Sequence, residues 1–72
     1  MFDTIIATHL SEMRRRLDKA AEIARVADAC ALAGSINAAV EVAFDIEQLI
    51  YEATALLNAT SLMHRIRQDA ER

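Results

Sequence analysis

The stretch that decides the fold is ADACALAGSINAAVE at residues 27–41, because it contains the one glycine of this 72-residue chain. The glycine is Gly34, Ser35 follows it, and the chain has no proline. Glycine readily adopts the left-handed conformation that ends many helices, and serine is favoured at the start of a helix. We therefore predict a tight turn at residues 33–36, with Ser35 or Asn37 capping the helix that follows.

Before this turn, apolar residues recur in alternating steps of four and three. This is the heptad pattern of a helix that packs lengthwise on another helix. The row consists of Ile6, Leu10, Met13, Leu17, Ala20, Ala24, Ala27 and Ala31. It begins with large side chains and ends in alanines, so the helices are expected to approach most closely near the turn. Asp3 or Thr4 is the expected N-cap of this first helix.

After the turn, apolar residues cover more than one side of a second predicted helix. One row consists of Ile36, Ala39, Ala43, Ile46, Ile50, Ala53 and Leu57, and another of Val42, Ile46, Leu49, Ala53, Leu56 and Met63. A helix that is apolar on several sides is buried on several sides, as in a bundle of more than two helices. The alternative is a break at residues 58–61 followed by a short third helix, although the apolar spacing beyond that segment favours one continuous helix.

Composition indicates a single small domain, residues 1–72, that needs a partner. A chain this short buries little surface by itself, and one cysteine, Cys30, forms no intramolecular disulfide. Because 54% of the residues are hydrophobic, two helices alone cannot cover them all. We predict an all-α antiparallel hairpin that dimerises into a four-helix bundle. The predicted oligomer interface consists of Ile46, Leu49, Ile50, Tyr51 and Leu56.

Charge indicates pairing within the hairpin rather than binding of nucleic acid. The net charge is −3, and the basic residues have no aromatic platform beside them. If the turn lies near Gly34, residues that face each other have numbers that sum to about 69 or 70. Basic residues then fall roughly level with acidic ones: Arg16, Lys19 and Arg25 with Glu52, Glu47 and Asp45.

Residues capable of chemistry are few and match no known motif. His9 and His64 both fall toward the open end of the hairpin, with Glu12 one turn from His9, so these three are weak candidates for a zinc site. The prediction is that the protein uses no metal or cofactor and that Cys30 is a small packing residue. No nucleophilic triad or glycine-rich phosphate loop is present, so we predict that the protein is not an enzyme.

The hypothesis from sequence is a cytoplasmic interaction protein. The N-terminus has no basic region of the kind that begins a secretory signal, and the apolar runs are too short for a membrane span. Its expected partner is itself, as a homodimer or higher oligomer, and it would act as an adaptor or regulator through protein contacts. One alternative is a small ligand- or metal-binding bundle, and another is a subunit that docks on a larger complex.

Overall fold

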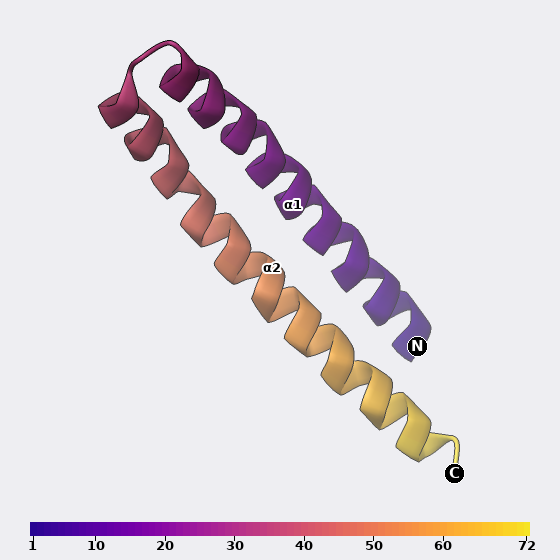
Figure 1. Ribbon diagram of the computed structural model, residues 1–72. Helices are drawn as coiled ribbons and strands as arrows, with labels where there is room; N and C mark the ends of the chain where they lie inside the picture. The colour runs from indigo at the N-terminus through magenta and orange to yellow at the C-terminus, as the bar shows by residue number, and fades with distance from the viewer.

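The computed structural model describes residues 1–72 as two helices joined by one turn (Figure 1). Helix α1 spans Phe2–Leu32 and helix α2 spans Ile36–Ala70. The two helices lie side by side and antiparallel, so both chain termini are at the open end of a rod measuring 58 × 14 × 12 Å. The predicted all-α hairpin is therefore confirmed, and no segment forms a strand.

The turn at residues 33–35 is built around Gly34, whose φ of 87° is the only positive value in the chain. The N–H of Gly34 donates to the carbonyl of Ala31 at 3.0 Å, and the N–H of Ser35 donates to the carbonyl of Cys30 at 2.9 Å. These two bonds form a Schellman motif, which satisfies carbonyl groups that the end of a helix otherwise leaves unpaired. The predicted position of the turn is confirmed.

The helix starts differ in part from the prediction. Met1 holds the N-cap position of α1, so the prediction of Asp3 or Thr4 at this position is wrong. The carboxylate of Asp3 instead accepts a hydrogen bond from Arg67 of α2. Ser35, one of the two predicted caps of α2, does occupy its N-cap position, although its side chain makes no capping hydrogen bond.

Helix α2 is continuous through residues 58–61, and the alternative with a short third helix is wrong. The hydroxyl of Thr60 donates to the carbonyl of Leu56 at 2.8 Å. Threonine hydroxyls can compete with helical backbone bonds, and here the hydroxyl is satisfied within the helix instead. The polar segment is therefore compatible with an unbroken helix.

The seam between the helices follows one half of the row predicted for α1. Ala20 is buried and Ile6, Met13 and Ala27 are half-buried, but Leu10, Leu17 and Ala24 of the same row are exposed. The other half of the α1 seam consists of His9, Arg16, Ile23 and Cys30. Two of these residues are polar, so a search for apolar spacing passes over their row. A long polar side chain can lie in such a seam because its hydrocarbon stem packs while its head reaches out.

The seam of α2 agrees with the second predicted row. Ala53 is buried, and the other members of that row, from Val42 to Met63, are half-buried. In the first predicted row, by contrast, Ile36, Ile50 and Leu57 remain exposed. These large side chains lie beside the seam rather than within it.

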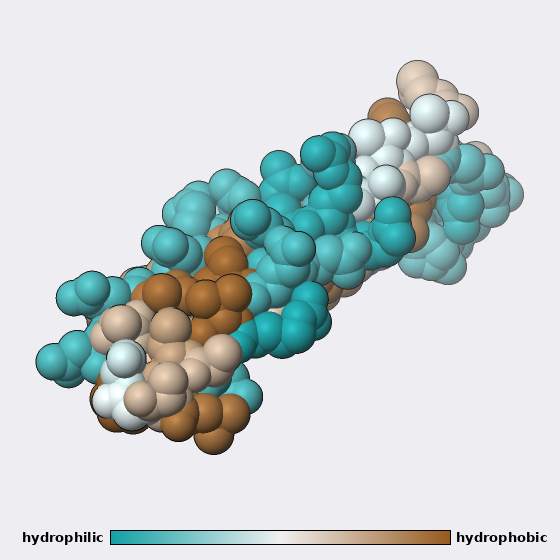
Figure 2. Space-filling view, turned by 90° about the horizontal axis from the view of Figure 1, so that it is seen from above, coloured by the Kyte–Doolittle hydropathy of each residue, from teal (hydrophilic) through white to brown (hydrophobic).

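The hairpin has almost no core of its own. Only three residues are buried, and all are alanines of the seam: Ala20, Ala39 and Ala53. Thirteen large apolar side chains remain at least 40% exposed. In the view of Figure 2, apolar and small residues cover the left end of the hairpin, where the chain turns, while hydrophilic residues cover most of the middle.

Candidate interaction surface

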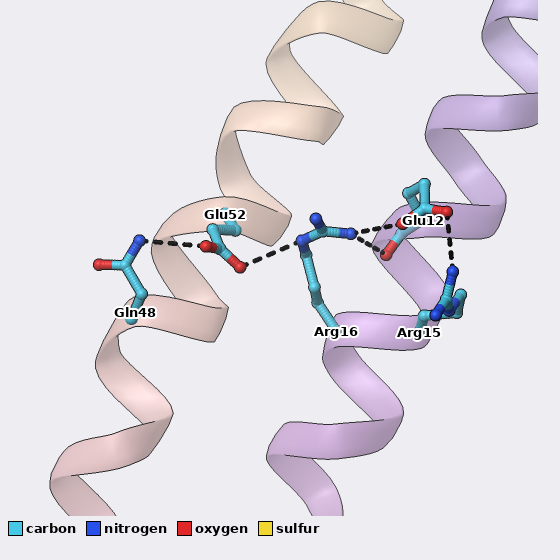
Figure 3. Close-up of polar contacts among 5 residues, drawn as sticks. All are labelled: Glu12, Arg15, Arg16, Gln48 and Glu52. Atoms are coloured by element: carbon cyan, nitrogen blue, oxygen red, sulfur yellow. Dashed lines mark hydrogen bonds and ion pairs between the residues drawn. The ribbon is translucent and has the colours of Figure 1, made fainter.

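One broad face of the hairpin, which we call the charged face, carries a network that joins the two helices (Figure 3). The Nε of Arg16 donates to Glu52 at 3.1 Å, and its Nη1 donates to Glu12 at 2.8 Å. Arg15 donates to the second carboxylate oxygen of Glu12 at 3.1 Å. Gln48 donates to the second carboxylate oxygen of Glu52, also at 3.1 Å. The Arg16 side chain thus bridges acids of both helices and aligns them.

The structure confirms one of the three charge pairs predicted across the hairpin, the pair of Arg16 with Glu52. The other two predictions are wrong: Lys19 with Glu47, and Arg25 with Asp45. Lys19 instead lies 3.7 Å from Glu22, one turn along its own helix. Arg25 makes no ion pair, because it lies on the side of α1 that is remote from α2.

The ion pairs favour the charged forms of two carboxylates. The hydrogen bond from Arg16, with the nearby charge of Arg15, lowers the pKa of Glu12. The hydrogen bond and charge of Arg67 lower the pKa of Asp3 in the same way. All these groups reach solvent, and exposed ion pairs contribute little stability. Their main effect is to fix the alignment of the two helices.

The opposite broad face can be traced residue by residue from the seam. The helices of an antiparallel pair are related by a two-fold axis, so positions that directly follow the seam on either helix share one face. At the open end these positions hold Asp3 and His64, and Arg67 contacts both, at 3.3 Å from its Nη2 to Nδ1 of His64. These contacts confirm that the two rows lie together.

Away from the open end, this second face carries no charge, and we call it the apolar face. Its residues on α1 are Leu10, Leu17, Ala24 and Ala31, and those on α2 are Ile36, Ala43, Ile50 and Leu57. The large members are 42–58% exposed, so each has apolar surface still to bury. The two faces of the hairpin therefore differ sharply in character: ion pairs hold the charged face together, whereas the second face is apolar everywhere except at the open end.

The five residues of the predicted oligomer interface point in three directions. Ile46, Leu49 and Leu56 are half-buried in the seam against α1. Ile50 lies on the apolar face and is 44% exposed, whereas Tyr51 lies on the outer side of α2 and is 70% exposed. Of the five, only Ile50 belongs to the apolar face. Sequence spacing alone did not distinguish this face from the seam.

The three weak metal candidates are not brought together. His9 lies in the seam, where its Nδ1 is buried without a hydrogen-bond partner. Glu12 belongs to the network on the charged face, and His64 contacts Arg67 on the other face. No three histidine, cysteine, aspartate or glutamate side chains converge as a metal site would require. Cys30 is half-buried in the seam, as the prediction of a packing residue implies.

Neither helix has a stretch that is long and apolar enough to cross a membrane. The chain matches no known protein-family model, and no curated protein and no solved structure is significantly similar to it. The surface itself is therefore the basis for a functional proposal.

Proposed function

We propose that the protein works as a homo-oligomeric helical bundle and acts through protein contacts, as an adaptor or regulator. The observation that carries this proposal is the contrast between three buried residues and thirteen exposed large apolar side chains. Soluble proteins that remain monomeric rarely leave such apolar surface contiguous and uncovered. A bundle of two hairpins would cover the five of these side chains that lie on the apolar face: Leu10, Leu17, Ile36, Ile50 and Leu57.

The distribution of charge supports a closed assembly. The apolar face is free of charged residues, whereas the opposite face carries the network around Arg16. A chain with one apolar face pairs with a copy of itself and then presents charged faces outward. A chain that was apolar on both faces would instead stack without limit.

The test is the mass of the purified protein in solution, measured by sedimentation equilibrium. We expect at least twice the chain mass of 8.0 kDa at micromolar concentration. A stable, soluble monomer under these conditions would contradict the proposal. Affinity capture of the tagged protein from its own organism then tests the adaptor role, since recovery of nothing but the protein itself would remove most of the support for an adaptor.

A second candidate function is docking on a larger partner, and two aromatic residues favour it. Phe44 and Tyr51 lie one heptad apart on the outer side of α2 and are 62% and 70% exposed. A dimer formed through the apolar face leaves this side open, and aromatic residues are common anchors of protein interfaces. Replacing both with alanine is expected to abolish capture of such a partner while the oligomer persists. Asn58→Ala, on the same side of α2, is the matched control.

A further inference from the structure

We infer that a second copy of this chain occupies the apolar face, with its turn at the opposite end of the dimer. The inference rests on the proposed function and deepens it, because it specifies which face pairs and in which direction. Two hairpins can meet face to face in two symmetric ways, with their turns at the same end or at opposite ends. Packing and charge both distinguish these arrangements.

The apolar face consists of four layers, each with one residue from either helix at nearly the same height. The pairs of Arg16 with Glu52 and of Asp3 with Arg67 set these heights. From the turn outward the layers are Ala31 with Ile36, Ala24 with Ala43, Leu17 with Ile50, and Leu10 with Leu57. Successive layers are seven residues, or about 10 Å, apart. Three of the four residues in the two layers nearest the turn are alanines, and the other two layers hold only large residues.

With both turns at one end, α1 packs on α2 of the second copy and each layer meets itself. Ala24 then faces Ala43 of the second copy, which leaves space between small side chains. One layer further out, Leu17 faces Ile50 of the second copy, which forces the helices apart. Protein interiors are closely packed, so a wedge of this kind loses contacts at one end of the interface.

With the turns at opposite ends, each helix packs on its own copy, and the order of the layers is reversed. Leu17 then faces Ala24 of the second copy, and Ile50 faces Ala43. At the ends, Leu10 faces Ala31 of the second copy, and Leu57 faces Ile36. Three of the four kinds of contact therefore join a large residue to a small one, which is the pattern that fills the space between helices evenly, and only the contact of Leu57 with Ile36 joins two large residues.

Charge at the border of the apolar face favours the same arrangement. Arg14 and Asp28 each lie one helical turn beyond a residue of this face, and neither forms an ion pair in the hairpin. With the turns at opposite ends, Arg14 of each copy comes level with Asp28 of the other. In the same-end arrangement, Arg14 instead comes level with Thr54 of the second copy, and Asp28 comes level with Val40 of the second copy. Glu47 meets its own copy near the two-fold axis, but solvent screens this exposed contact.

The size of the contact is sufficient for a specific dimer. The hairpin is 58 Å long and 14 Å wide, and about 40 Å of its length overlaps when the two-fold axis lies midway between Leu17 and Ala24. The overlap covers on the order of 600 Å² on each copy, which reaches the lower end of the roughly 1,200–2,000 Å² that stable interfaces bury in total.

The direction of the dimer is tested by a distance between spin labels at the turn. The full chain carries Cys30→Ala and Ser35→Cys, so each copy has one label. Opposite turns predict about 40 Å between labels, because Ser35 lies between 14 and 15 residues from the axis. Turns at the same end predict less than about 25 Å, from the spacing of neighbouring helices. Ala21→Cys in the same background lies near the axis and is the control that reports a dimer of either kind.

A charge exchange gives an independent test. Arg14→Glu is expected to raise the dimer dissociation constant roughly fivefold, from two exposed ion pairs lost per dimer. Adding Asp28→Arg to the same chain restores the pairs and is expected to restore the affinity. The two positions are 14 residues, or about 21 Å, apart on one helix, so they have no direct coupling within a monomer.

The outcomes separate the two proposals. A dimer mass with the long distance and with restored affinity supports both. A dimer mass with a short distance between the turn labels overturns the opposite-end arrangement. So does a dimer in which Asp28→Arg fails to restore the affinity lost in Arg14→Glu. Either result leaves the proposed oligomeric function standing. A monomer mass overturns the proposed function itself.

Discussion

Three consecutive residues of α2 offer the sharpest test of how the surface is divided. Leu49 lies in the seam, Ile50 on the apolar face and Tyr51 on the outer side of the helix. Aspartate at each position introduces the same charge one residue further along the same helix. Local helix propensity therefore changes by similar amounts, and the differences between the three variants report what each side chain contacts.

The expected magnitudes follow from burial. Full burial of a leucine or isoleucine contributes about 1.5–3 kcal/mol. Ile50 is 44% exposed, so about 1 kcal/mol per copy is left for the dimer, or about 2 kcal/mol for two copies. Ile50→Asp is thus expected to weaken the dimer about 30-fold, and the cost of desolvating a carboxylate adds to this. Leu49→Asp removes seam packing and is expected to lower the stability of the hairpin itself by about 2–3 kcal/mol.

Tyr51→Asp is expected to change neither quantity by more than about 0.5 kcal/mol, since its side chain is mostly in solvent. Sedimentation equilibrium measures the dimer dissociation constant, and urea unfolding at low protein concentration measures the stability of the hairpin. An unchanged dissociation constant for Ile50→Asp would refute the assignment of the apolar face. Equal weakening by Ile50→Asp and Tyr51→Asp would refute the division of the surface.

Four other predictions follow from the same structure. Gly34→Ala is expected to lower the free energy of unfolding in urea by about 1–2 kcal/mol, because φ is 87° at this position and alanine is strained there. An added Cβ would meet no other atom, so backbone strain is the only expected effect, and unchanged stability would contradict it. Ala53→Leu, at a position only 5% exposed, is expected to destabilise the hairpin by about 1–3 kcal/mol through overpacking, and a neutral thermal melt would show that the seam has room. The pKa of Glu12 is lowered in the folded state, so the stability from its pair is present above about pH 4.5 and lost as pH falls through the lowered value; Glu12→Gln should flatten this part of the melting profile. A chelator is expected to leave the melting temperature unchanged, and a chain with His9→Ala and His64→Ala to stay folded and oligomeric; a rise with stoichiometric zinc that this double variant loses would favour a metal-binding bundle instead.

The turn and the length of both helices could be predicted because their determinants are local. One glycine in a chain without proline leaves a single place where a helix ends in the left-handed conformation. The same local reasoning aligned Arg16 with Glu52, because the position of the turn fixes which residues lie level. The continuity of α2 followed from apolar spacing on both sides of its polar segment.

The true seam of α1 could not be found from apolar spacing, because His9 and Arg16 occupy one of its two rows. The row chosen in their place, with Leu10 and Leu17, is apolar for a different reason: it forms the apolar face. Hydrophobic periodicity shows that a position avoids water, but it does not say whether another helix of the same chain or a separate surface covers it. A signal was present in the charges, since the pair predicted between Arg16 and Glu52 places Arg16 on the side of α1 that faces α2.

The elongated shape of the hairpin changes how its assembly has to be measured. Its radius of gyration is 16.7 Å, whereas a compact domain of this length has about 11 Å and one with 16.7 Å has roughly 200 residues. A single hairpin therefore elutes from a sizing column earlier than a globular protein of its own mass, and an early elution volume alone says nothing about partners. The opposite-end dimer doubles the forward intensity of X-ray scattering at equal mass concentration, but because about 40 Å of each 58 Å hairpin overlaps, it is only about 18 Å longer than one hairpin. Dimer formation should thus appear in small-angle scattering as a doubled intensity with only a small rise in radius of gyration.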